Sequence, residues 1–523
     1  MKNIGNDIKN VFLSHVPENA LLLSEKLLFS CKYPTSVNHA ILLQKLAKTD
    51  VSTKFIKILI SLYSKAKMSV KVGEQISLSV DVTEGVLQGE VLSPIIFALF
   101  LADLSDFLEY RGIVGVNISC NYDISLLAYA DDLVFIATSP AGLKKLLKAL
   151  HEYCTLNHLT LNPRKSKIII FKKGGPKMDT HFYYGNTEIE VVNDYTYLGI
   201  SFCSSGLFEK SANIVVAKAS LASASVISLL GSTKYVISWD KINLLFTSLV
   251  SSIISHASPV WALKYLSMLE KIQCQFFKRV LWLPKCTPNY AVRLEVGRPH
   301  LSVHILKLTL NWLTKLAKMP QTRYPYMCLL CLCTYDTKNS NIVKYNWVSM
   351  VKQVFFSPIN ELELWDDLNN FLMPEVVERV LDKFSAYTYM LDMESVPISS
   401  SLLFYPSLNI NNECRSYFYF KISFEIKRIY SQCRLLNIYS KRIITKKGVY
   451  KFHDMGDCNY CNRDNNDLLH KNSLSRKPRN ASTPCQLNID RRHRKPNYEE
   501  NRIQLPTRCN HQKYASVWSP SSS

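Results

Sequence analysis

Two adjacent aspartates stand between apolar runs in the stretch AYADDLVFIA, residues 128–137. Such short apolar runs predict a β-hairpin over 126–137, with Asp131 and Asp132 near its tip. Two ionised carboxylates repel each other, so burying them beside Leu, Val, Phe and Ile costs free energy unless a cation shares the site. Carboxylate oxygens on a hairpin suit Mg²⁺. A plain Asp-Asp turn facing water is the alternative that this stretch alone leaves open.

The segments on either side of this hairpin mix helical and strand patterns. Apolar residues at helical spacing predict two amphipathic helices in 40–63 and a third helix in 141–159. Alternating residues predict a second hairpin over 67–82 and a strand pair over 191–202. The chain up to about residue 205 is therefore expected to mix α and β structure.

A glycine-containing loop and a predicted apolar helix lie ahead of the aspartates. Ser93 is expected as the N-cap of this helix and Pro94 as its first residue, where the missing N–H costs nothing. Gly85 and Gly89 would let the backbone approach a base or a sugar, and Gln88 can donate and accept hydrogen bonds. A glycine-punctuated turn with no ligand is the alternative.

The later part of the chain is predominantly helical in pattern. Basic and aromatic residues are interleaved in helical stretches between about 207 and 312, as in LEKIQCQFFKRVLWL, residues 269–283. From about residue 320, aromatic-rich helical stretches alternate with turns. From Asn472 the chain is rich in Arg, Lys, Asn, Ser and Pro without apolar periodicity, which predicts a disordered basic tail.

The charge of the chain favours a polyanionic partner. Its 63 Lys and Arg residues against 42 Asp and Glu give a formal net charge of +21. Cations that neutralise phosphates release counterions, so nucleic acid is favoured over an acidic membrane surface. A soluble protein that is merely basic is the alternative.

The cysteines and the N-terminus indicate an intracellular protein that is not secreted. Fifteen cysteines spread over 523 residues do not resemble a disulfide scaffold and are expected to be reduced. Acidic residues and a proline interrupt the N-terminal segment where a signal peptide would be apolar. The best candidate for a membrane span, 242–263, contains many serines with Asn243, His256 and Pro259, so a buried helix is expected there and no membrane partner.

Several of these motifs together resemble reverse transcriptases. Tyr129-Ala130-Asp131-Asp132 resembles the YADD box of that family. The other elements follow in the family's order and spacing. They are the preceding loop and helix with Gly85, Gln88, Gly89, Ser93 and Pro94; the later motif with Leu161, Asn162 and Lys165; and the primer-grip turn Tyr197-Leu198-Gly199. The segments 36–46 and 269–288 are similar to the non-LTR (LINE-type) retrotransposon branch.

The resemblance implies a fold, an activity and partners. The fold would be α+β, with a polymerase palm and incomplete fingers followed by an α-helical thumb and a helical C-terminal region. The activity would be RNA-directed DNA synthesis by two-metal nucleotidyl transfer, with Asp131 and Asp132 as Mg²⁺ ligands. Its partners would be an RNA template, a DNA primer and deoxynucleoside triphosphates. The corresponding divisions are a divergent segment 1–35, a palm 36–205, a thumb and linker 206–320, a C-terminal helical region 321–471 and a tail 472–523.

The resemblance also implies roles for single residues. Lys165 could protonate or neutralise the leaving pyrophosphate, or it could belong to a solvated basic cluster with Arg164 and Lys167. Tyr197 could brace the primer backbone, or it could be a core aromatic residue. The family's function implies a nuclear or cytoplasmic location. Oligomeric state is left open.

One catalytic carboxylate of the family is missing from its expected place. Where the family has a strand with two acids, this chain has FSCKYPT, residues 29–35, with no aspartate and with Pro34 in a strand position. Asp7, Glu18 and Glu25 are the carboxylates that could replace it. Impaired polymerase activity is therefore expected. The alternatives are a non-catalytic nucleic-acid-binding remnant, or a chain that does not fold stably because its palm lacks a central strand.

A partial metal motif lies near the C-terminal end. Cys458 and Cys461 have half-site spacing for Zn²⁺, and His470 follows them. The cysteine that would complete the family's element is replaced by Ser475. Zn²⁺ binding and free thiols on a loop are both open.

Overall fold

The computed structural model describes residues 21–26, 37–49, 51–85, 92–119, 122–129, 132–172, 180–232, 238–338, 345–402, 405–408, 416–437 and 442–451. The chain divides into two compact units, Met1–Ser440 and Lys441–Ser523. The described part of the second unit is an antiparallel hairpin of β16 (Arg442–Thr445) and β17 (Gly448–Lys451). All that follows concerns the first unit.

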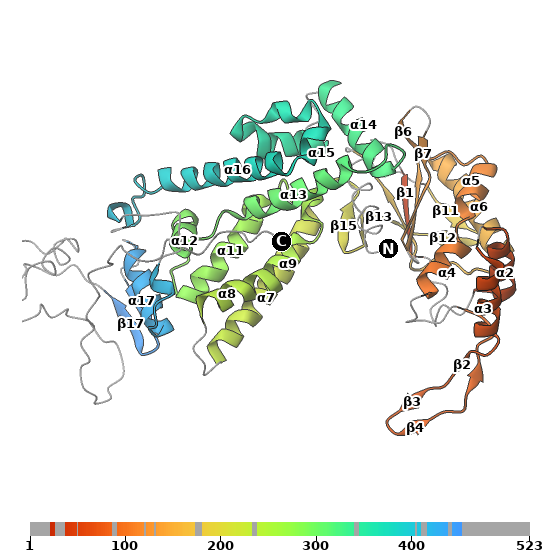
Figure 1. Cartoon of the computed structure of the whole chain (residues 1–523), viewed down its shortest axis with the longest axis horizontal. Coiled ribbons are helices and arrows are strands. Elements are labelled where there is room, and N and C mark those ends of the chain that lie inside the picture. Colours follow the sequence, from red (N-terminus) through yellow and green to blue (C-terminus); the bar gives the residue numbers. More distant parts are fainter. Residues whose placement is uncertain are drawn as a thin grey trace, which may run out of the picture. The chain divides into compact units, whose positions relative to one another are not determined.

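A five-stranded sheet in the order β13-β10-β1-β9-β8 carries the aspartate hairpin. Figure 1 labels β1 and β13 of this sheet. Its strands are β1 (Leu21–Lys26), β8 (Leu126–Tyr129), β9 (Asp132–Ala137), β10 (Lys167–Ile170) and β13 (Val191–Val192). β1 is antiparallel to both β9 and β10. The predicted hairpin over 126–137 is confirmed, because β8 pairs antiparallel with β9.

The hypothesis that this sheet lacks its central strand is wrong. β1 occupies the central place, but it begins eight residues ahead of the stretch in which the family pattern predicted a strand. Its first three residues are leucines, and they stand opposite Ala137, Ile136 and Phe135 of the buried strand β9. An apolar run therefore provides the central strand. Residues 27–36, which include Pro34, lie outside the described residues.

Helices cover the sheet and extend from it. These are α2 (His39–Ala47), α3 (Thr53–Tyr63), α4 (Ser93–Phe100), α5 (Leu104–Tyr110) and α6 (Pro140–Leu156). The helices predicted in 40–63 and 141–159 are confirmed. α6 begins after Ser139, whose hydroxyl accepts a hydrogen bond from the Gly142 N–H at 3.1 Å. Leu143, Leu146 and Leu150 of α6 are buried in the core that it forms with β9.

The predicted N-cap of α4 is wrong by one residue. Leu92 is the cap residue, it has helical backbone angles and its side chain makes no capping hydrogen bond. Ser93 is the first helical residue and is buried, so Pro94 is the second residue of the helix and is exposed.

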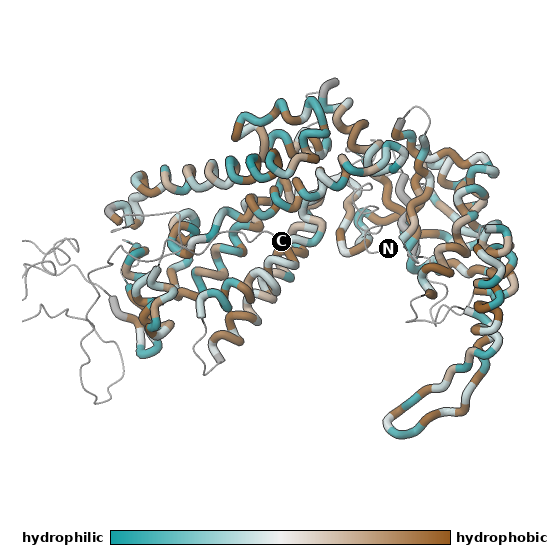
Figure 2. The backbone as a smooth tube through the Cα atoms, viewed as in Figure 1, coloured by the Kyte–Doolittle hydropathy of each residue, from teal (hydrophilic) through white to brown (hydrophobic). Residues whose placement is uncertain are grey.

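The hairpin predicted over 67–82 is confirmed as a ribbon of β2 (Lys67–Met68), β3 (Lys71–Val72), β4 (Gln75–Ile76) and β5 (Val80–Asp81). Gly73 turns the chain with a φ of 61°. All residues from 67 to 81 are exposed. Hydrophobic and hydrophilic residues alternate along the ribbon (Figure 2).

Three further antiparallel strand pairs complete the β structure of the described residues. They are β6 (Val116–Ser119) with β7 (Tyr122–Ile124), β11 (Phe182–Tyr184) with β12 (Thr187–Ile189), and β14 (Asp194–Tyr197) with β15 (Ile200–Cys203). The third pair confirms the strand pair predicted over 191–202. Contacts between β10 and β14 join this pair to the central sheet.

From Glu209 to Arg434 the described residues are helical, as predicted. The α-helices are α7 (Glu209–Ser232), α8 (Trp239–Leu245), α9 (Ser252–Ser255), α10 (Ser258–Trp261), α11 (Leu266–Leu281), α12 (Asn289–Val296), α13 (Leu301–Ala317), α14 (Tyr324–Lys338), α15 (Trp347–Val351), α16 (Pro374–Glu394) and α17 (Phe424–Arg434). Shorter π and 3-10 segments are η1 (Phe246–Ser251), η3 (Lys352–Phe356), η4 (Ser357–Ile359), η5 (Leu362–Trp365), η6 (Leu368–Leu372), η7 (Tyr405–Ser407) and η8 (Ser416–Phe418).

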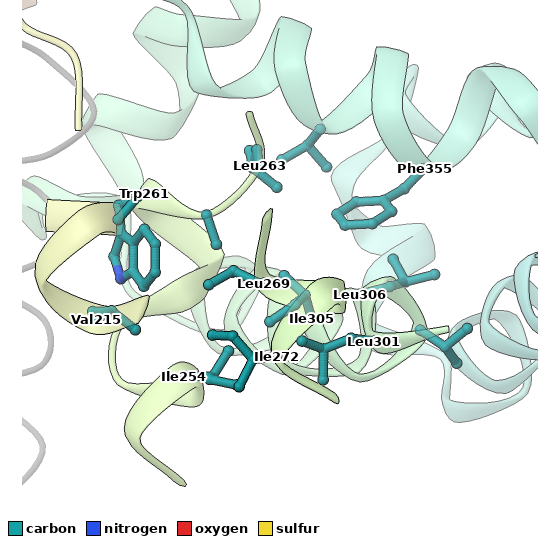
Figure 3. Close-up of a cluster of buried hydrophobic side chains, with 14 of the residues drawn as sticks. Val215, Ile254, Trp261, Leu263, Leu269, Ile272, Leu301, Ile305, Leu306 and Phe355 are labelled. Atoms are coloured by element: carbon teal, nitrogen blue, oxygen red, sulfur yellow. The ribbon is translucent and has the colours of Figure 1, made fainter. Parts of the chain in front are cut away.

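The core of this helical region joins segments that lie far apart in the sequence. Val215 of α7, Ile254 of α9, Trp261 of α10 and Ile305 of α13 belong to one buried cluster (Figure 3). The stretch 242–263 is thus buried in part, as predicted, but it is not one helix. It consists of α8, η1, α9 and α10.

One described helix is long and apolar enough to cross a membrane, judged by length and composition alone. This is Glu209–Gly231, and 22% of its most apolar 18-residue stretch is buried. The helix contacts α11, η1, α9 and β15. These contacts bury part of its apolar face, including Val215 and Val226, whereas Leu221 is exposed.

A buried ion-pair cluster links α11, α12 and α16. The Arg293 Nε donates to Asp392 Oδ2 at 2.7 Å, and its Nη1 donates to Glu270 Oε1 at 3.0 Å. Glu270 Oε2 also accepts the Leu301 N–H at the start of α13, at 2.6 Å. One guanidinium therefore compensates two buried carboxylates, and the three helices are held together by polar contacts as well as by the core.

Candidate active site

Asp132 is the first residue of β9 and pairs with Tyr129, the last residue of β8. Its side chain is 9% exposed, and the residues that follow it in β9 are buried. Ala130 and Asp131, which connect the strands, lie outside the described residues. The described part of the pair is therefore a carboxylate at the end of a buried strand, held in place by the backbone of the hairpin.

The neighbouring strand carries a lysine at the level of Asp132. In the pairing of β1 with β9, Lys26 stands opposite Asp132 and Glu25 stands opposite Leu133. The other two carboxylates that could replace the missing ligand, Asp7 and Glu18, lie outside the described residues. In this register the residue of the central strand that is paired with Asp132 is a lysine, whereas the family pattern has an acid in this strand.

The Tyr197-Leu198-Gly199 segment forms a tight turn between β14 and β15. Tyr197 pairs with Ile200, and the two residues between them have positive φ values of 48° for Leu198 and 83° for Gly199. A two-residue hairpin loop with positive φ at both positions is a type I′ turn. A leucine in the left-handed region costs about 1–2 kcal/mol, so the surrounding structure must hold Leu198 there.

Tyr197 brings this turn next to the aspartate hairpin. Its side chain is 3% exposed, and burial raises the pKa of its phenol, with the negative charge of Asp132 and the nearby Tyr129 raising it further. The interpretation of Tyr197 as a core aromatic residue is therefore confirmed. The same residue belongs to a buried cluster that includes residues of β8 and β9. Three residues predicted in separate motifs, Tyr129, Asp132 and Tyr197, lie close enough together to interact electrostatically.

Lys165 lies at the same end of the sheet as Asp132. It is exposed in the turn before β10, and its N–H donates to the Asn162 carbonyl at 3.2 Å. β10 is separated from β9 by β1, so two strand spacings, about 10 Å, separate the backbones. Of the two basic neighbours, Lys167 pairs with Glu190 at 2.7 Å and Arg164 is exposed. The catalytic and the solvated-cluster interpretations of Lys165 both remain open.

Gly85 fixes the start of the predicted nucleotide-contacting loop. Its N–H donates to the Val37 carbonyl at 2.9 Å, and its carbonyl lies 2.8 Å from the His39 Nε2. Its φ of 88° suits a glycine. Both of its polar backbone groups are thus engaged by the residues at the start of α2. Gln88 and Gly89 lie outside the described residues.

The carboxylates available fit one metal ion better than two. No group of three or more His, Cys, Asp or Glu side chains within the described ranges could hold a metal ion. Asp131 is adjacent to Asp132 in sequence, so the hairpin offers two carboxylates. In β1 the residue paired with Asp132 is Lys26, and the one acid of the strand, Glu25, is paired with Leu133. Cys458, Cys461 and His470 all lie outside the described residues, so the zinc hypothesis stays a prediction.

His256 is a neighbour of the site that no sequence motif indicated. Its Nε2 lies 3.3 Å from the Leu198 carbonyl oxygen. The two residues are 58 positions apart in the chain. Because no local pattern links them, the contact could not be anticipated from motif spacing.

Comparisons with known proteins support the resemblance to reverse transcriptases. Residues 35–202 match the family model described as reverse transcriptase (RNA-dependent DNA polymerase). The chain is 25% identical over 179 residues to the Retrovirus-related Pol polyprotein from type-1 retrotransposable element R2 of Popillia japonica, covering 33% of this chain and 29% of that protein. It is 34% identical over 131 residues to the type-2 element R2DM polyprotein of Drosophila melanogaster, covering 23% of this chain and 12% of that protein.

The matches therefore cover less than a third of the length of these relatives. Among solved structures, the apo telomerase of Candida tropicalis is similar over 73% of this chain and 55% of its own, with 15% identity and a TM-score of 0.30. At that score the two structures differ too much for their residues to be compared.

Proposed function

Residues 35–202 are a reverse transcriptase domain of the non-LTR retrotransposon type, and from this premise we propose that the chain binds an RNA template paired with a DNA primer but carries an incomplete polymerase site. One observation carries the second part of this proposal. Lys26 stands opposite Asp132 in the central sheet.

The proposed architecture assigns the observed elements to polymerase subdomains. The sheet β13-β10-β1-β9-β8 with α6 would form the palm. The helices from α7 to α13 would form the thumb and its linker. The ribbon over 67–81, with α2 and α3, would be what the chain keeps of the fingers. A duplex seated on the palm would then place its primer end near Asp132 and the Tyr197-Leu198-Gly199 turn.

The proposed chemistry starts from the two adjacent carboxylates. Asp131 and Asp132 would hold Mg²⁺, which when bound can activate a 3′-hydroxyl and stabilise a leaving pyrophosphate. A second metal ion would need a further carboxylate, and the residue paired with Asp132 on the neighbouring strand is a lysine, which is not a metal ligand of this kind. The hairpin would thus hold a metal weakly, and nucleotidyl transfer would be slow.

Primer extension on an RNA template tests this proposal. We expect the purified chain to bind a labelled template–primer duplex in fluorescence anisotropy and to extend it only weakly with Mg²⁺ or Mn²⁺. Asp132→Asn should abolish whatever extension remains and leave binding within about twofold, because the carboxylate is not needed for phosphate contacts. Fast extension by the unaltered chain would refute the incomplete site, and absence of salt-sensitive duplex binding would refute the nucleic-acid function.

The second candidate function is a non-catalytic nucleic-acid-binding protein. The net charge of +21 favours it, although the segment LEKIQCQFFKRV contributes less than its composition suggested. Lys278 in α11 is buried and donates to Asn289 Oδ1 at 2.8 Å, whereas Lys271 and Arg279 are exposed on one helix face. Binding whose affinity falls steeply with salt, with no extension under any metal, would favour this candidate.

A further inference from the structure

His256 occupies a sharp corner between two helices. It follows α9 with φ −60° and ψ 109°, and the next residue, Ala257, is left-handed with φ 50°. The Trp261 indole Nε1 donates to the His256 carbonyl at 2.9 Å. Trp261 is itself buried in the core of the helical region. The backbone at His256 is therefore hydrogen-bonded to a side chain of the buried core, Trp261, which Figure 3 shows among its apolar neighbours.

From this corner the imidazole reaches the β14–β15 turn. Its Nε2 lies 3.3 Å from the Leu198 carbonyl oxygen, a distance at which an N–H on that nitrogen donates to the carbonyl. A Cβ placed on Gly199 would lie 3.0 Å from the same nitrogen. The ring thus contacts Leu198 and leaves little room for a side chain at the next residue, Gly199.

The turn needs such a support. Leu198 is held in a left-handed conformation that leucine does not favour. The residue before it, Tyr197, belongs to the same buried cluster as Leu127 of β8 and Val134 of β9, the two strands of the aspartate hairpin. A shift of the turn would therefore disturb the packing beside that hairpin.

We propose that His256 is a positioning residue that holds the Leu198–Gly199 turn where the end of a paired primer strand would contact it. The inference rests on the proposed function, because it takes the turn to be part of a template–primer site. It assigns to the helical region a direct part in shaping that site. A lost hydrogen bond at the turn should weaken duplex binding about fivefold, and binding of unpaired template RNA should be unaffected.

A second histidine–glycine pair in the chain supplies a matched control. Gly185, at the turn between β11 and β12, has a φ of 57°, and a Cβ placed on it would lie 3.1 Å from the His151 Cε1. His151 projects from α6 and also packs edge-on against Tyr184. Here too a histidine ring lies against a glycine with positive φ, but the nearest ring atom is Cε1 rather than Nε2, and the turn is a different one.

The experiment compares His256→Ala, His256→Gln and His151→Ala in the full chain. Affinities for a labelled RNA–DNA duplex with a recessed primer end and for the unpaired RNA are measured by anisotropy, with thermal unfolding as a check of folding. We expect His256→Ala to weaken duplex binding about fivefold, His256→Gln to restore most of it through its side-chain amide donor, and His151→Ala to leave it unchanged. Affinity for unpaired RNA should stay the same in all three variants.

Three outcomes would overturn the inference in distinguishable ways. If the unaltered chain does not bind the duplex, the proposed function fails and this inference fails with it. If the unaltered chain binds but His256→Ala behaves like His151→Ala, only the role of His256 is refuted. If His256→Ala weakens the binding of the duplex and of unpaired RNA equally, His256 has a structural role and not a positioning role. The same holds if His256→Gln folds but fails to restore duplex binding.

Discussion

Lys26 of β1 and Asp132 of β9 occupy directly opposed positions in neighbouring antiparallel strands. The residue of the central strand that is paired with Asp132 is therefore a lysine and not an acid. The strand order is continuous at this point, because β1 lies between β9 and β10. The proposed incomplete site thus depends on which residue stands at this position, and not on a missing strand.

Lys26→Asp should create polymerase activity or increase it. The change removes a repulsive charge and adds a third carboxylate beside the hairpin, so we expect primer extension with Mg²⁺ to rise on the order of a hundredfold. The double variant Lys26→Asp/Asp132→Asn should lose the gain, which ties it to the metal site. Glu25→Gln is the control for the neighbouring position and should have no effect. Strong extension by the unaltered chain that Glu25→Gln abolishes would instead identify Glu25 as the third ligand.

The place of β1 shows what sequence reasoning could and could not find. The hairpins, the α2, α3 and α6 helices and the helical second half were all predictable, because each follows from local periodicity. The central strand was sought at 29–35 because a family pattern places two acids there. In the structure a run of leucines from Leu21 fills the gap between β9 and β10. Pairing with buried partners decided the location, and no local pattern reports such pairing.

In the candidate site, too, single residues could be found from the sequence, whereas the contacts between them could not. Asp132 and Tyr197 were found from motifs, since each motif is local. Their proximity, and the contact of His256 with Leu198, depend on how distant segments pack. The left-handed corner at Ala257 that directs His256 toward the turn has no sequence signature, because neither glycine nor asparagine marks it.

Gly199→Ala should destabilise the protein by about 1–2 kcal/mol, because alanine disfavours a positive φ. The added methyl group would also crowd the His256 ring. The free energy of unfolding in urea measures the effect. Gly231→Ala is the matched control, because Gly231 is in α7 and has open space around it. This variant should be more stable by about 0.4–1 kcal/mol of unfolding free energy. Equal effects of the two changes would contradict the strain argument.

Arg293→Met should cost about 3–5 kcal/mol of unfolding free energy, because it leaves Glu270 and Asp392 as uncompensated buried charges. The three side chains are only 10%, 4% and 11% exposed. Arg111→Met is the control. Its ion pair with Glu152 is at the surface, with side chains 43% and 34% exposed, and should contribute about 0–1 kcal/mol. A cost for Arg293→Met as small as that of the surface pair would show that the buried cluster does not stabilise the helical region.

The stability of the helical region should fall in acid partly through Asp336. Burial alone would raise the pKa of this carboxyl, but hydrogen bonds from Lys352, at 2.7 Å, and from Ser349, together with the charge of Lys352, lower it overall. The folded state therefore releases this proton more readily than the unfolded chain does. The resulting stabilisation is complete above the ordinary aspartate pKa of about 3.9 and is lost as the pH falls through the lower value of the folded state.

This dependence is tested by measuring the free energy of unfolding in urea for the unaltered chain and for Asp336→Asn. The measurements run from pH 2 to pH 6 in steps of about one pH unit. The variant should be less stable than the unaltered chain at pH 6, and the difference should shrink toward acid, since the amide does not titrate. Asp382→Asn is the control, because Asp382 is an exposed aspartate of α16. A difference between Asp336→Asn and the unaltered chain that stays constant over the whole range would mean that the contribution of Asp336 is hydrogen bonding without a change in proton affinity.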